Sequence, residues 1–211
     1  MKIAHNPSDS EPILSRSDLV MIADMIPENA KVLDLGCGSG RLLRVLKARK
    51  NARIMGVELD QEKLIQCMER GVPVIQADLN EPLSLFADNS YDYVVLSRTL
   101  QAVQRPDLIL QEMLRIGGKG IISIMNFGQL DARMQMLKGH MPVTKRLPLK
   151  WYDTPNIHLS TIDDFRKLCC ELGFQIEEEI PIPARFPRLS KLCPNFFAVG
   201  GVFVLKQGSK V

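Results

Sequence analysis

The chain has 211 residues, 45% of them hydrophobic and 24% charged, and its formal net charge is +3. This length and composition suit one globular domain with a sizeable core, and they exclude a disordered or fibrous chain. So small a charge gives no support to nucleic-acid binding. The apolar runs are too short to cross a bilayer, and the polar stretch from Pro7 to Pro12 lacks the apolar core of a signal peptide. We therefore expect a cytoplasmic protein that does not bind membranes and for which nucleic-acid binding is disfavoured.

The five cysteines are not spaced for metal binding, because no two of them form a Cys-x-x-Cys pair. We expect reduced thiols and no metal site. One of them, Cys37, lies within a glycine-rich stretch, where we interpret it as a small residue that fits the turn and not as a nucleophile.

Strands alternate with helices along most of the chain. We expect a flexible tail over residues 1–12 and one domain over residues 13–207. The first helix is expected to be capped by Ser17 and closed by Pro27; later helices are expected after Gly40, over 60–70, from Pro106, and from a cap at Ser160 or Thr161 to Gly173. The predicted strands cover residues 32–35, 53–57, 72–76, 91–96, 119–125, 174–180 and 197–205.

This alternation predicts an α/β fold with a mostly parallel seven-stranded sheet and helices on both faces, of the Rossmann-like kind. Parallel strands present their carboxyl ends at one edge of a sheet. The loop at Gly36 and the strand ends at Glu58, Asp78 and Ser97 should therefore converge on one crevice.

The stretch from Lys31 to Arg41 reads as a buried strand, a glycine turn and the start of a helix. Such a turn lets a ligand approach the backbone, and the helix behind it offers unpaired N–H groups. No Lys-Ser/Thr pair follows Gly40, which excludes a phosphate-binding P-loop, and the glycines run GxGxG where a dinucleotide fingerprint has GxGxxG. Asp34, two residues before Gly36, would repel a pyrophosphate and attract an ammonium or sulfonium group.

The pattern Asp-x-Gly-x-Gly-x-Gly after a strand resembles motif I of class I S-adenosylmethionine (SAM) methyltransferases. The resemblance implies SAM, or S-adenosylhomocysteine, as the cofactor. Asp34 would face its amino group, Glu58 would accept the ribose hydroxyls, and Asp78 would accept the adenine amino group. The expected cofactor-binding set is Asp34, Gly36, Cys37, Gly38, Gly40, Glu58, Leu59, Asp78, Leu79 and Ser97.

The sequence says less about the molecule that would accept the methyl group, and it assigns no catalytic residue. Arg98 or Gln101, after the fourth strand, would contact a substrate or pack against a helix. The Asp/Asn-Pro-Pro-Tyr signature of amino-directed methyltransferases is absent there. His158 is the one histidine that we place near the crevice as a candidate base.

The second half of the chain resembles one family, the methionine-biosynthesis protein MetW. The resemblance runs from about Leu19 to Leu205, and the run Trp-Tyr-Asp-Thr-Pro-Asn-Ile-His at 151–158 is its most specific part. Other matching segments are 96–103, 126–128, 139–144, 147–148 and 161–165. This chain departs from the family pattern before Asn126, at Gln129-Leu130 and at His140, so neither Gln129 nor His140 receives a family role.

The resemblance implies a SAM-binding methyltransferase fold that acts with a MetX-like homoserine O-acyltransferase in methionine biosynthesis, with no assured methyl transfer of its own. The alternative is a free-standing SAM-dependent methyltransferase acting on a small molecule. An RNA methyltransferase, suggested only by scattered basic residues, is disfavoured. The inserted segment 127–158 is expected to contain a helix and to serve as a partner interface or as a lid over the ligand.

Overall fold

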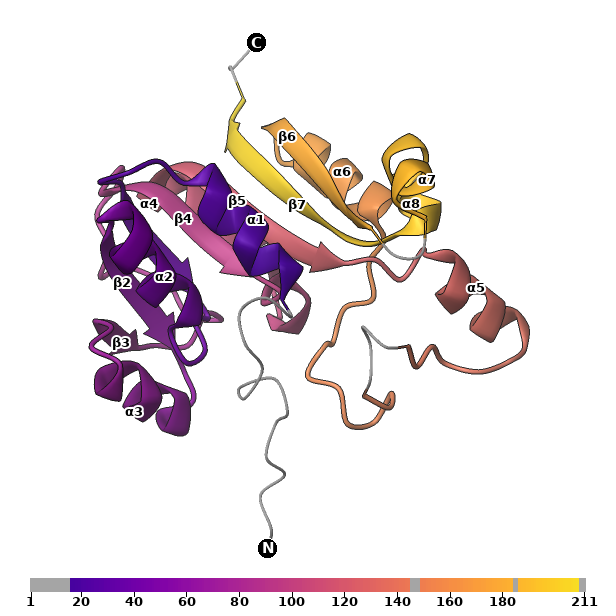
Figure 1. Cartoon of the computed structure of the whole chain (residues 1–211), viewed down its shortest axis with the longest axis horizontal. Coiled ribbons are helices and arrows are strands. Elements are labelled where there is room, and N and C mark those ends of the chain that lie inside the picture. Colours follow the sequence, from indigo (N-terminus) through magenta and orange to yellow (C-terminus); the bar gives the residue numbers. More distant parts are fainter. Residues whose placement is uncertain (1–15, 145–148, 184–185, 209–211) are drawn as a thin grey trace, which may run out of the picture.

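The computed structural model describes residues 16–144, 149–183 and 186–208. The tail expected over residues 1–12 lies outside these ranges. The described chain forms one seven-stranded sheet of order β3-β2-β1-β4-β5-β7-β6, in which only β7 runs antiparallel to its neighbours (Figure 1). The strands are β1 Lys31–Leu35, β2 Arg53–Glu58, β3 Val74–Gln76, β4 Tyr91–Ser97, β5 Gly117–Met125, β6 Phe174–Pro183 and β7 Ala198–Gln207. The predicted α/β architecture is confirmed.

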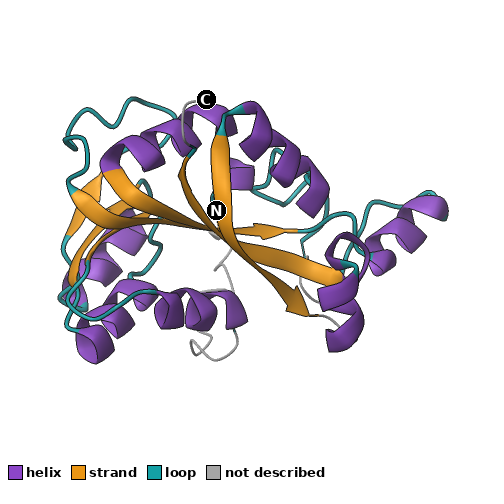
Figure 2. Ribbon diagram, turned by 90° about the horizontal axis from the view of Figure 1, so that it is seen from above, coloured by secondary structure: helices purple, strands orange, loops and turns teal. Residues whose placement is uncertain are grey.

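Helices cover both faces of the sheet (Figure 2). The helices α1 (Ser17–Met25), α2 (Arg41–Lys50) and α3 (Gln61–Glu69) share one buried cluster, which includes Leu19, Leu43 and Cys67. On the other face, α4 (Pro106–Ile116) and α6 (Ile162–Glu171) pack through Leu110 and Phe165. The central strands β1, β4 and β5 are therefore buried on both faces, while the edge strand β6 keeps exposed residues.

Local signals place most helix ends where the sequence predicts them. The Asp60 side chain accepts hydrogen bonds from the backbone N–H groups of Glu62 and Lys63, and Thr161 with Asp164 forms a capping box at the start of α6. The prediction for Ser17 is wrong, because the helix begins at Ser17 and Arg16 occupies the cap position.

Two connections differ from the expectation. The third strand starts at Val74 and not at residue 72, since Val72 is used to close the turn after α3 through its N–H bond to the Cys67 carbonyl. The link between β6 and β7 forms two short helices, α7 (Pro187–Leu192) and α8 (Pro194–Phe197), each with proline in its first turn.

The segment after β5 contains the expected helix, α5 (Leu130–Leu137), which projects away from the sheet (Figure 1). A short 3-10 helix, η3 (Leu100–Ala102), lies between β4 and α4. In the part of the chain that the structure describes, we find no helix with the length and apolarity needed to span a bilayer.

Candidate ligand-binding site

The glycine loop crosses the carboxyl ends of β1 and β2. The backbone N–H groups of Gly36 and Cys37 both donate to the Val57 carbonyl, at 2.8 and 3.0 Å. Gly36 has a φ of +73°, and a Cβ there would lie 2.7 Å from the Thr99 side chain, so only glycine fits. Gly38 also has a positive φ, of +56°, but nothing lies within 4 Å of where its Cβ would be. The loop thus presents open backbone on one side and tight packing on the other.

Glu58 ends β2 and fixes this loop. Its carboxylate accepts from the backbone N–H of Gly38 at 2.8 Å, and from those of Leu59 and Asp60 at 2.9 and 3.1 Å. A negative charge is therefore held at the mouth of the glycine loop, where it also satisfies three backbone donors.

Asp34 is buried in β1, with 3% of its surface exposed, and its Oδ1 atom has no hydrogen-bond partner. Burial raises the pKa of this carboxyl to about 7; the positive charge of Arg16 opposes the increase and the negative charge of Glu58 adds to it. A buried oxygen without a donor is costly unless something completes its environment. Asp34 Oδ1 therefore has a capacity to accept a hydrogen bond that no described group of the protein uses.

A cavity of about 50 Å³ lies beside Asp34. Five of the predicted site residues line it, namely Asp34, Gly36, Cys37, Gly38 and Ser97. The remaining lining residues are Arg16, Leu19, Ser39, Arg41 and Leu42. Because cofactor pockets typically enclose roughly 300–1,000 Å³, a ligand of that size would have to widen this cavity or extend beyond it.

The other predicted residues do not line the cavity. Gly40 caps α2 in a left-handed conformation, and Leu59 is 55% exposed. Asp78 accepts from the backbone N–H and the side-chain amide of Asn80, both at 2.9 Å, while Leu79 packs against the core. Glu58 is also outside the lining. It ends β2, while Gly40 follows β1, Leu59 follows β2, and Asp78 and Leu79 follow β3, so all five lie at the carboxyl ends of the strands, as predicted.

Sequence reasoning missed Asp18, a fully buried carboxylate at the same edge. It accepts from Arg16 Nη2 at 2.6 Å and Arg98 Nη2 at 2.9 Å, and the Ser97 and Ser123 hydroxyls lie at 3.2 and 3.4 Å. Burial would raise the pKa of Asp18, but the hydrogen bond and charge of Arg16 and the charge of Arg98 outweigh it and hold the pKa below its usual value. This cluster ties α1 to the ends of β4 and β5.

The candidate substrate residues have structural partners. Arg98, which has an unusual φ of +57°, bonds to Asp18. Gln101 is 2% exposed, and its side chain bonds to both backbone groups of Met125 and to Ser160 Oγ. His158 Nε2 lies 3.3 Å from the Gln104 carbonyl and outside the cavity lining.

Cys37 and Cys67 approach each other beneath the loop, with their sulfur atoms 4.0 Å apart. The hydrogen bond to Cys67, together with burial, raises the pKa of the Cys37 thiol, which makes it a weak nucleophile at neutral pH. Among the described residues, no three His, Cys, Asp or Glu side chains are grouped as a metal site would require.

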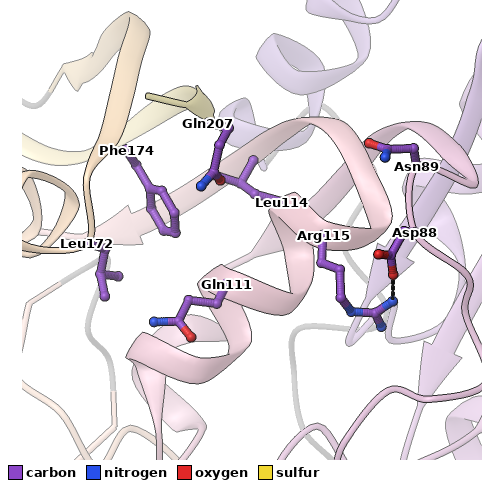
Figure 3. A pocket seen from close by; sticks show the side chains of 8 residues that line it. All are labelled: Asp88, Asn89, Gln111, Leu114, Arg115, Leu172, Phe174 and Gln207. Atoms are coloured by element: carbon purple, nitrogen blue, oxygen red, sulfur yellow. Dashed lines mark hydrogen bonds and ion pairs between the residues drawn. The ribbon is translucent and has the colours of Figure 1, made fainter. Parts of the chain in front are cut away.

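A larger hollow, of about 480 Å³, lies at the opposite edge of the sheet (Figure 3). Its one arginine, Arg115, already uses its donors on Asp88, Glu112 and the carbonyls of Leu83 and Phe86. Figure 3 shows the Arg115–Asp88 pair lying along one side of this hollow. The smaller cavity is the better functional candidate because it contains a buried group that lacks a partner.

Solved structures that share this architecture include SAM-dependent methyltransferases. One from Archaeoglobus fulgidus has a TM-score of 0.68 at 17% identity, covering 92% of this chain and 93% of that one. A possible histamine N-methyltransferase from Thermotoga maritima has a TM-score of 0.67 at 20% identity, covering 92% and 89%. At these identities the likeness shows the fold alone. The protein therefore has the single-domain, Rossmann-like fold of class I SAM-dependent methyltransferases.

Comparison of the sequence identifies the family within this class. Residues 16–205 match the family described as methionine biosynthesis protein MetW. A bifunctional methionine biosynthesis protein MetXA/MetW from Rhodopirellula baltica is 38% identical over 83% of this chain and 30% of its own length. The chain belongs to the MetW family, as the resemblance in its second half predicted. It spans less than half the length of the curated relatives that it matches.

Proposed function

We propose that this protein binds SAM, or S-adenosylhomocysteine, at the glycine loop and acts in methionine biosynthesis as the partner of a homoserine O-acyltransferase. The proposal that the protein binds SAM rests on Asp34 Oδ1, which is buried beside the cavity without a hydrogen-bond partner. The proposed partnership rests on the relative whose name joins MetXA and MetW in one protein.

The residues present fit the proposed ligand. Asp34 would accept the ammonium group of the methionine end, and Arg16, which also lines the cavity, offers a positive charge for its carboxylate. Glu58 would accept the ribose hydroxyls, in exchange for its present bond to Gly38 N–H. Leu59, Asp78 and Leu79 would contact the adenine. When bound, SAM supplies a methyl group on sulfonium sulfur; the residues described here bind and orient it.

A role in partnership also has a chemical rationale. SAM is made from methionine, so its concentration reports the output of the pathway, and homoserine acylation is an early step of the same pathway. A SAM-binding partner could therefore adjust the acyltransferase to supply. This requires SAM to bind the free protein and the complex with different affinities, because a ligand of equal affinity shifts no equilibrium.

Calorimetric titration tests both parts. SAM should bind the wild-type protein, and Asp34→Ala should weaken that binding by at least tenfold, since a charge-assisted hydrogen bond contributes roughly 1.5–3 kcal/mol. The same titration, repeated in the presence of saturating purified acyltransferase, measures the coupling. Equal affinities with and without the acyltransferase would exclude a regulatory role for SAM, and no SAM binding at all would exclude the site.

The alternative is a free-standing methyltransferase acting on a small molecule, which the fold of the structural relatives favours. Methyl transfer needs chiefly an acceptor aligned with the sulfonium methyl group. Incubation with methyl-labelled SAM and a metabolite extract would reveal a labelled product. If the label moved to a metabolite only when the intact cavity was present, with Asp34→Ala as the inactive control, catalysis would replace partnership as the primary role.

A further inference from the structure

The segment between β5 and α6 carries an unusual amount of exposed apolar surface. We call its described residues 130–144 and 149–159 the arm. Of the eighteen large hydrophobic side chains that are exposed in the described chain, ten belong to the arm. They are Met134, Met136, Leu137, Met141, Val143, Leu149, Trp151, Tyr152, Ile157 and Leu159. Singly scattered apolar side chains are normal on a protein surface, so it is the concentration of so many in one segment that points to a binding role.

The arm is not held by packing into the core. Within α5, only Ala132 is buried, and the helix points away from the sheet (Figure 1). It is held by polar contacts. The Gln135 side chain bonds to both the N–H and the carbonyl of Val143, at 2.9 and 3.1 Å. Arg133 lies over the Phe196 ring, 4.9 Å from its centroid, which ties α5 to α8.

The second half of the arm is joined to the sheet through Gln101. The Gln101 carbonyl accepts from the backbone N–H groups of Ile157 and His158, at 2.9 and 3.0 Å. Its buried side chain bonds to Met125, the last residue of β5, and to Ser160. The apolar side chains of the arm are therefore presented on a backbone that is already positioned, which lowers the entropy cost of binding.

The arm does not act as a wall of the ligand cavity, because none of its described residues lines it. Its apolar side chains thus remain available after the ligand site is accounted for. Of the two roles that the sequence left open for this segment, lid or interface, the geometry favours the interface.

We infer that the arm is the surface on which the acyltransferase docks, an inference that rests on the proposed function. A standard interface takes roughly 800 Å² and about 20–30 residues from each partner, so the ten exposed large side chains of the arm are enough to form the apolar part of one such surface. Trp151 and Tyr152 pack edge to face, with centroids 5.5 Å apart, and are 69% and 60% exposed. Aromatic residues of this kind commonly dominate binding energy at interfaces.

Two exposed substitutions test the surface without disturbing the core. Leu137→Asp and Trp151→Asp change side chains that are 80% and 69% exposed, and Leu85→Asp, 72% exposed between β3 and β4, is the matched control. Binding of each variant to purified acyltransferase is measured by surface plasmon resonance. We expect each arm variant to bind at least tenfold more weakly and the control to bind as the wild type does, with SAM affinity unchanged in all three.

The possible outcomes distinguish a failure of the docking surface from a failure of the proposed partnership. If the wild type does not bind the acyltransferase at all, both the proposed partnership and the docking surface fail. If the wild type binds the acyltransferase and both arm variants bind it as tightly as the wild type does, only the docking surface is wrong. An equal loss in Leu85→Asp would also overturn it. Light scattering tests whether the arm instead binds a second copy of this chain. If the wild type is a dimer and the arm variants are monomers with unchanged affinity for the acyltransferase, the arm is a dimer interface and the docking inference is wrong.

Discussion

At the scale of single residues, two buried carboxyl groups at this sheet edge differ in their hydrogen-bond partners and in the direction of their pKa shifts. Asp18 is fully buried and is bonded to two arginines, whereas Asp34 is equally buried and has one oxygen without a donor. The pKa of Asp18 is lowered and that of Asp34 is raised to about 7. The difference lies in the partners and not in burial. Asp18 therefore stabilises the fold, while Asp34 carries the proposed contact with the ligand.

The raised pKa of Asp34 predicts that replacing it stabilises the protein. The carboxyl is neutral in the folded state up to about pH 7 but ionises near pH 4 when unfolded, so stability is lost as the pH rises between these values. Asp34→Asn should raise the unfolding free energy at pH 8 by on the order of 1–3 kcal/mol, and by much less at pH 4.5. Urea unfolding at both pH values measures this. An equal effect at both pH values would show that ionisation of Asp34 is not the cause.

At the scale of elements, the residues just after β4 connect the glycine loop to the arm. Gly36 packs against Thr99, which lies between β4 and η3, and the neighbouring Gln101 holds the arm. The turn after β4 thus contacts the ligand loop on one side and the segment proposed as an interface on the other. It is a short chain of contacts between the two.

The two glycines of the loop should respond differently to the same substitution. Both Gly36 and Gly38 have positive φ, but only Gly36 would bring a Cβ into contact with Thr99. Gly38→Ala should cost about 1–2 kcal/mol for its left-handed backbone, and Gly36→Ala roughly 1–3 kcal/mol more because of the clash. Thermal unfolding of both variants measures the difference. Thr99→Ala should recover part of the extra loss in Gly36→Ala but none in Gly38→Ala, and failure to do so would reject this packing.

At the scale of the whole molecule, binding and stability are linked. The site is assembled from β1, β2, β4, α1 and α2, so it exists only in the folded chain. A ligand that binds this site must therefore stabilise the entire domain. The exposed arm, in contrast, contributes little to the core and should respond to a partner more than to the ligand.

SAM at one hundred times its dissociation constant should raise the unfolding free energy by about 2.7 kcal/mol. Glu58→Gln should reduce this gain at a fixed SAM concentration, because an amide accepts the ribose hydroxyls less strongly than a carboxylate does. Differential scanning calorimetry at several SAM concentrations measures the shift. Leu85→Asp, at an exposed position outside the cavity lining, should show the full gain. An undiminished gain in Glu58→Gln would remove Glu58 from the site.

Much of the fold followed from local patterns. The alternation of strands and helices, the glycine turn and the helix within the inserted segment were all predicted, and the MetW resemblance was confirmed. The cap of α6 was predicted at Ser160 or Thr161, and the structure places it at Thr161. The helices between β6 and β7 were not predicted, because their prolines read equally well as breakers or as first-turn residues. Asp18 was missed because, of its partners, only Arg16 is close in the chain, whereas Ser97, Arg98 and Ser123 are remote.

The sequence by itself determined the family, the order of the elements and the edge of the sheet at which polar residues meet, since these depend on periodicity and on residues close together in the chain. Only the tertiary structure decided which of those residues have partners. It gave Glu58, Asp78, Arg98 and Gln101 hydrogen bonds within the protein and left Asp34 Oδ1 without one. Such an assignment depends on atoms that approach within about 3 Å after folding, which no spacing along the chain can specify.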